Sequence, residues 1–142
     1  MSMLRTLAFW GLALATGLIF AASPDGRKIG ERTARKLVEE ALVATGKRVP
    51  SSQIRPIAFY WSPEFYNFEA VLGQSEGLPA LRYAFSVNPW NGEVWSIMEC
   101  TRVTSPAIEK EQDAIWKRSG LPAEAREPLH EKRPGTCAAD DD

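Results

Sequence analysis

The sequence feature that most constrains this fold is the segment Asn-Pro-Trp-Asn-Gly at residues 88–92. Asparagine favours the first position of a reverse turn, proline favours the second, and glycine suits a position with a left-handed backbone. Apolar and polar residues alternate through 80–88, which is typical of a half-buried strand, and residues 93–99 can form a return strand. We therefore predict a β-hairpin at this place in the chain.

The length of the hairpin loop decides which side chains are buried together, because directly opposed residues share a face of the sheet. A loop of three or five residues places Trp95 and Ile97 on the same face as Phe85. A two-residue turn at 91–92 would instead send both side chains to the polar face. Burial of apolar side chains favours the odd loop, with Gly92 as a bulge residue.

Further strands and helices are predicted on both sides of this hairpin. Residues 57–61 and 65–72 have the composition of strands, and residues 31–45 carry an apolar stripe at helical spacing. A second helix is predicted over 106–119, with Ser105 as its cap. The predicted fold class is α+β: one amphipathic helix packed on a four-stranded antiparallel meander, plus a C-terminal helix.

The N-terminus has the layout of a secretory signal. One positive charge, Arg5, precedes an uncharged run over 7–20 and the small residues at 21–23. The run is shorter than the roughly 20 residues of a spanning helix. We predict a signal peptide over 1–23 and a periplasmic or extracellular protein. The alternative is an uncleaved N-terminal anchor, which would be the chain's one contact with a membrane.

The remainder divides into a predicted domain over 29–121 and a tail over 122–142. The tail is polar and ends in three aspartates, so we expect it to be flexible.

Two cysteines, Cys100 and Cys137, are present in the whole sequence. An exported protein meets oxidising conditions, so we predict a disulfide between them, which would close a loop of about 38 residues. A free or intermolecular thiol is the alternative. No metal site is predicted, because two cysteines and one histidine lack the spacing of a metal-binding motif.

Charge and motif content argue against nucleic-acid binding and against catalysis. The 17 basic and 18 acidic residues nearly balance, so bulk charge does not attract nucleic acid. Residues 73–77 match the pattern G-x-S-x-G, but a strand rather than a helix is predicted to follow. The one histidine, His130, falls in the predicted tail and is expected to be solvated. We therefore predict a protein that is not an enzyme and needs no cofactor.

The helix-then-sheet order and the hairpin V-N-P-W-N-G-E-V-W, Val87 to Trp95, resemble a PepSY domain. The usual hairpin of that family is V-D-A-x-T-G-E-V followed by an apolar residue, and the resemblance covers residues 31–98. It implies an exported, non-catalytic module with a binding or inhibitory role, and a protein partner such as an exported peptidase. It carries over no catalytic residues.

The candidate contact residues are aromatic or lie in the hairpin turn: Trp90, Asn91, Trp95, Tyr60 and Tyr66. Trp90 is expected to be the most exposed aromatic, where it could anchor a partner, unless it packs back on its own hairpin.

The alternative function is an envelope protein that holds a ligand in an apolar cleft between the sheet and the first helix.

Overall fold

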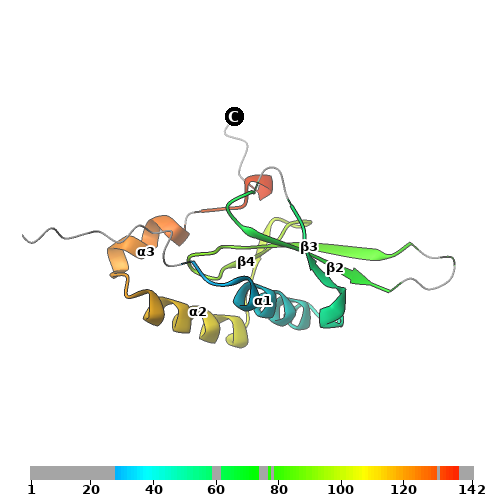
Figure 1. Ribbon diagram of the computed structural model, residues 1–142, viewed down its shortest axis with the longest axis horizontal. Coiled ribbons are helices and arrows are strands. Elements are labelled where there is room, and N and C mark those ends of the chain that lie inside the picture. Colours follow the sequence, from blue (N-terminus) through cyan, green and yellow to red (C-terminus); the bar gives the residue numbers. More distant parts are fainter. Residues whose placement is uncertain (1–27, 59–61, 74–76, 78, 131, 138–142) are drawn as a thin grey trace, which may run out of the picture.

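The computed structural model describes residues 28–58, 62–73, 77, 79–130 and 132–137 (Figure 1). The predicted signal peptide over 1–23 lies outside these residues. Across the described part, no helix has both the length and the apolar character needed to cross a bilayer.

The described residues form one antiparallel sheet of five strands in the order β1-β2-β3-β4-β5. This confirms the predicted α+β class and corrects the strand number from four to five. The strands are β1 (Ile54–Pro56), β2 (Tyr66–Leu72), β3 (Leu81–Val87), β4 (Val94–Ser96) and β5 (Thr101–Val103).

Three strands differ from the predictions. The return strand predicted over 93–99 is only Val94–Ser96, because residues 97–100 form a turn, and the other two differences lie at the sheet edges. The first strand comes earlier than 57–61: β1 pairs Ile54 with Ala70 and Pro56 with Phe68. Of the predicted strand, residues 59–61 lie outside the described residues. The fifth strand, β5, has only three residues, which is too short to give an alternating pattern in the sequence.

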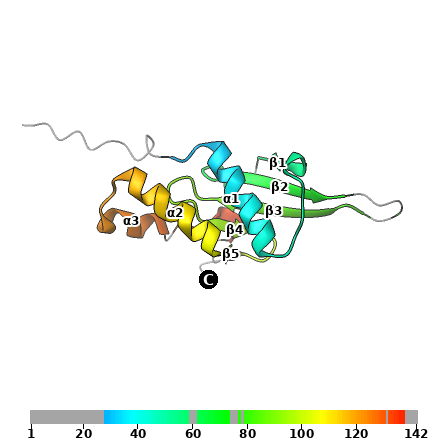
Figure 2. The same cartoon turned by 90° about the horizontal axis from the view of Figure 1, so that it is seen from below.

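Two helices cover one face of the sheet (Figures 1 and 2). Helix α1 (Glu31–Ala44) buries the apolar stripe seen in the sequence, and α2 (Pro106–Ser119) lies beside it. The stripe packs against sheet residues Phe68, Phe85, Val87 and Val94 in one core. The bounds of α2 agree with the prediction: the Ser105 hydroxyl accepts a hydrogen bond from the Ile108 N–H, and Gly120 ends the helix with a left-handed backbone.

The predicted register of the hairpin is wrong. β3 and β4 pair Val87 with Val94 and Ser86 with Trp95, so the loop comprises the six residues 88–93. Val94 therefore enters the helix-covered core, and Trp95 points to the other face of the sheet. The prediction treated this second face as the polar face, but the C-terminal segment covers part of it (Figure 1).

The segment after residue 122, which was predicted as a tail, covers part of that second face. It contains helix α3 (Ala123–His130) and the 3₁₀ turn η3 (Gly135–Cys137), which lies across the sheet from α1 and α2 in Figure 1. Cys100 and Cys137 form the predicted disulfide, with their Cα atoms 5.2 Å apart. The sequence does not reveal this cover because α3 contains Pro128 and buries none of its own residues.

Candidate functional site

The hairpin loop over 88–93 is held by hydrogen bonds within itself. The Asn88 side-chain oxygen accepts from the Trp90 N–H at 2.9 Å, and the Asn91 side-chain oxygen accepts from the Glu93 N–H at 2.8 Å. The Gly92 N–H donates to the Asn88 carbonyl at 2.9 Å. Two successive asparagine turns of this kind explain why the sequence places Asn at both positions.

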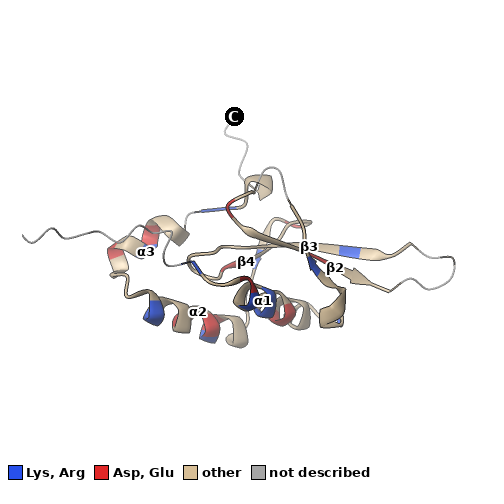
Figure 3. Ribbon diagram, in the orientation of Figure 1, with Lys and Arg blue, Asp and Glu red and all other residues tan. Residues whose placement is uncertain are grey.

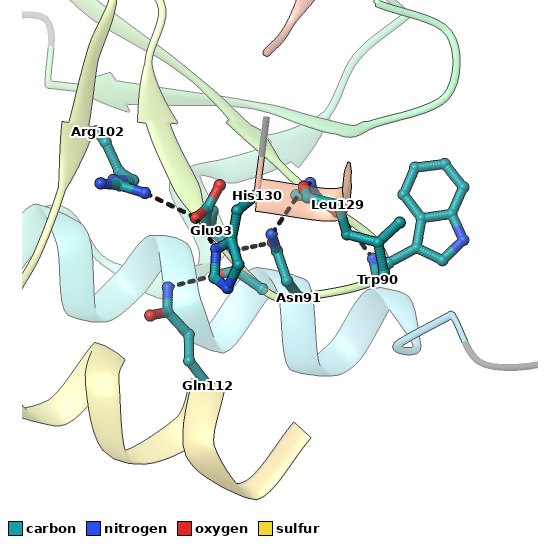
Figure 4. A network of polar contacts seen from close by, with 9 residues as sticks. Trp90, Asn91, Glu93, Arg102, Gln112, Leu129 and His130 are labelled. Atoms are coloured by element: carbon teal, nitrogen blue, oxygen red, sulfur yellow. Dashed lines mark hydrogen bonds and ion pairs between the residues drawn. The ribbon is translucent and has the colours of Figure 1, made fainter. Parts of the chain in front are cut away.

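Other segments of the fold bond to the same loop (Figure 4). The side-chain amides of Asn88 and Asn91 both donate to the Leu129 carbonyl of α3, at 3.0 and 3.1 Å. The Gln112 amide of α2 donates to the Gly92 carbonyl at 3.1 Å. The Ile29 N–H, just before α1, donates to the Pro89 carbonyl at 2.7 Å. The loop therefore joins the helices and is itself buried.

Trp90 is not the exposed aromatic that the sequence predicted. Its side chain is only 7% exposed, and its ring has the ammonium groups of Lys28 and Lys132 at 5.3 and 4.2 Å from the ring centre. Asn91 is fully buried. The reason is the position of the loop, which bonds to α2, to α3 and to the segment before α1, so that other parts of the chain surround it.

The other candidate contact residues lie in separate places. Trp95, 8% exposed, lies on the second sheet face, with the Arg133 guanidinium 5.9 Å from its ring centre. Tyr66 pairs with Val87 in the sheet, and its hydroxyl donates to the Ile29 carbonyl at 2.7 Å. Tyr60 lies outside the described residues. The described candidates therefore do not form one exposed surface.

The polar centre of this region is Glu93, a buried carboxylate with only 3% of its surface exposed. One oxygen, Oε1, accepts a hydrogen bond from Arg102 Nη1 at 2.8 Å and lies 2.8 Å from His130 Nδ1 (Figure 4). Its second oxygen has no hydrogen-bond partner among the described residues, and the same is true of the Trp95 indole nitrogen. A buried carboxylate is stable only when cations or donors surround it, which accounts for the two partners.

His130 is therefore held by the fold, although its side chain is 42% exposed, as expected of a solvated residue. Its ring also lies 5.3 Å from the ring of Trp116, and the guanidinium of Arg126 lies 5.2 Å from that ring. Sequence patterns did not point to Glu93, Arg102, His130 or Arg133 as members of a site. The one feature of the sequence that could have indicated this site is the acidic residue Glu93, which stands between the turn and the apolar residues of a strand.

A cleft of about 380 Å³ opens beside this carboxylate and is lined by Trp95, Arg102, His130 and Arg133. The lining combines a flat aromatic ring with two guanidinium groups, an arrangement suited to an anion. Among the residues that the structure describes, no group of three or more His, Cys, Asp or Glu side chains could hold a metal ion. Ser75 of the G-x-S-x-G pattern lies outside the described residues.

Comparison with known proteins gives one match in fold and none in sequence. No protein-family model and no curated protein matches this chain. The fold is similar to that of a chain in the structure of a type VI secretion system effector-immunity complex from Pseudomonas protegens. The TM-score is 0.60 at 16% identity, over 77% of this chain and 94% of that chain. The likeness shows a shared fold.

Proposed function

We propose that this protein is a small, exported, non-catalytic domain that binds and inhibits another protein. The observation that carries the proposal is the likeness in fold to a chain from an effector-immunity complex, which extends over nearly all of that chain. A chain of this architecture thus occurs in an effector-immunity complex. The arrangement of charged and aromatic groups beside Glu93 supports a polar contact with such a partner.

Export is supported by the disulfide and by the predicted signal segment. Disulfides form and persist mainly outside the reducing cytoplasm, and Cys100–Cys137 ties the C-terminal segment to the sheet. The PepSY resemblance remains a prediction, and an exported peptidase is the class of partner that it implies. We propose the broader role, binding and inhibition of a protein, without relying on that family.

The alternative function, a protein that holds a ligand between α1 and the sheet, receives less support. In the described residues, that interface is filled by side chains with 1% exposure or less, among them Leu37, Phe68 and Phe85. A ligand-sized molecule at this interface would have to displace these buried side chains.

The test is recovery and reconstitution of the partner. The full chain, carrying a C-terminal affinity tag, is purified from the exported fraction under non-reducing conditions, beside an unrelated exported domain with the same tag. A protein enriched only with this chain is then made separately, and the dissociation constant of the pure pair is measured by calorimetry. We expect a stoichiometric complex that lowers the partner's own activity. A chain that stays in the cytoplasm, or a purified pair that does not associate, would overturn the proposal.

A further inference from the structure

We infer that the cleft between Trp95, Arg102, His130 and Arg133 receives a carboxylate side chain presented by the protein partner. The inference rests on the proposed function and names the chemistry of the contact. It has three supports: an excess of positive charge on this side of the sheet, an arginine without an ion pair among the described residues, and a rigid aromatic wall.

The first support is the charge on the sheet face that carries Trp95. Arg55 and Arg82 share the single carboxylate of Glu69, with N···O distances of 3.2 and 2.8 Å. Arg102, which pairs directly with Trp95 across the strands, has Glu93 as its partner.

Arg133 adds a further positive charge beside Trp95, so the described residues that take part in these contacts include four arginines and two glutamates. The chain as a whole has a net charge of −1, so the excess is local. By contrast, Lys, Arg, Asp and Glu are interspersed along α1 and α2 (Figure 3).

The second support is the donor capacity that remains in the cleft. Arg133 is exposed and forms no ion pair within the described residues; its guanidinium contacts the Trp95 ring. Arg102 is 49% exposed and donates to Glu93 through Nη1, which leaves the rest of its guanidinium for another acceptor. A guanidinium presents five N–H donors in a planar fork that matches a carboxylate.

The third support is the rigidity of the wall. Trp95 is buried and held in the sheet between Ser86 and Arg102, and η3 is tied to the sheet by the disulfide. Groups that are already ordered lose little conformational entropy on binding. The two guanidinium groups would attract a carboxylate and repel a metal cation, and the ordered indole ring holds the Arg133 guanidinium beside the cleft.

The cleft can be tested without knowing the partner. The full-length oxidised protein is titrated at low salt with N-acetylglutamate amide, and the indole N–H signal of Trp95 is followed by NMR. N-acetylglutamine amide has the same shape without the charge, and inorganic phosphate tests a different anion. We expect a saturable shift with the glutamate probe and none with the glutamine probe.

The matched variants are Arg133→Gln, in the cleft, and Arg32→Gln, an exposed arginine on α1. Loss of one charged donor corresponds to about a tenfold weaker affinity. We expect that loss in R133Q and none in R32Q. An unchanged affinity in R133Q, a shift with both probes, or tighter binding of phosphate would overturn the inference.

A chain ending at residue 139 tests whether the protein's own terminal aspartates occupy the cleft. If the truncation alone shifts the Trp95 signal and the probe binds only after it, the occupant is the chain itself, and the inference fails. Failure of the proposed function looks different: the glutamate probe binds the cleft, but no purified partner associates. Conversely, a partner that binds the wild type and R133Q equally would support the proposed function and overturn the inference about the cleft.

Discussion

Replacement of Gly92 by alanine tests whether the buried hairpin loop organises the fold. Gly92 has φ +74°, and a Cβ atom there would lie 2.6 Å from Ile115 Cδ1 and 3.1 Å from Leu37 Cδ1. Both neighbours are buried side chains, on α2 and α1, so neither can move away freely. The substitution therefore combines a backbone cost with a packing cost.

The two costs can be estimated separately. A left-handed backbone costs a residue with a Cβ atom about 1–2 kcal/mol, and overpacking of a core costs about 1–3 kcal/mol. Alanine also restricts the unfolded chain, which offsets about 0.4–1 kcal/mol. We expect G92A to lower the free energy of unfolding by about 3 kcal/mol, a large part of the roughly 5–15 kcal/mol of a typical domain.

The assay is urea denaturation of the oxidised protein, with Gly120→Ala as the control. Gly120 has a similar φ of +62°, but a Cβ atom added there would have no neighbour within 4 Å, so G120A carries the backbone cost alone. The double variant G92A/I115V removes the clashing Cδ1 atom and should show a favourable coupling energy of about 1 kcal/mol or more. Equal destabilisation by G92A and G120A, with no coupling to Ile115, would refute the close packing of the loop.

Three further predictions concern the C-terminal segment, the loop amides and pH. Cys100→Ser/Cys137→Ser should lower the free energy of unfolding by about 4 kcal/mol from loop-closure entropy over 37 residues, and reduction of the wild type should have the same effect in urea denaturation. Asn91→Ala removes the hydrogen bonds to the Glu93 N–H and the Leu129 carbonyl, and should lower the free energy of unfolding by about 1–3 kcal/mol. Relative to the wild type, hydrogen exchange of the backbone amides should become faster in α3 by more than it does in β2. The hydrogen bond from Lys36, with the charges of Lys36 and Arg118, holds the pKa of Glu111 below its ordinary value of 4.5 despite partial burial. The ionised Glu111 carboxylate therefore stabilises the fold fully above pH 4.5, and this contribution is lost as the pH falls through the lower pKa of the folded state. Glu111→Gln should destabilise the protein at pH 7 and have no such effect in strong acid. An equal effect of the substitution at both pH values would contradict this reasoning.

Local patterns in the sequence predicted the elements whose signals are contained within one segment. The stripe through Ala34, Leu37 and Leu42 defined α1, because helical spacing and burial coincide there. Ser105, Pro106 and Gly120 defined both ends of α2, because their preferences follow from backbone geometry alone. The disulfide was predicted from the oxidising environment of an exported protein and from the even number of cysteines, since two cysteines allow one intramolecular pairing.

The candidate site could not be found in this way, because its members come together through contacts distant in sequence. Glu93 meets Arg102 and His130, nine and 37 residues away, after β4 and β5 pair and α3 folds back. His130 has no local signal at all, and the polar composition of residues 122–142 suggested a flexible tail.

The sequence by itself determined the fold class, the first helix, the limits of the second and the existence of the hairpin. Those depend on backbone preferences and on the periodicity of apolar residues, which act over a few neighbouring positions. Only the tertiary structure decided the register of the hairpin and the burial of Trp90, Asn91 and Trp95. Hairpin register depends on which parts of the sheet are covered. Here part of the second face is covered by a segment that the disulfide at Cys137 holds in place, so Trp95 is buried there and Val94 packs beside Val87.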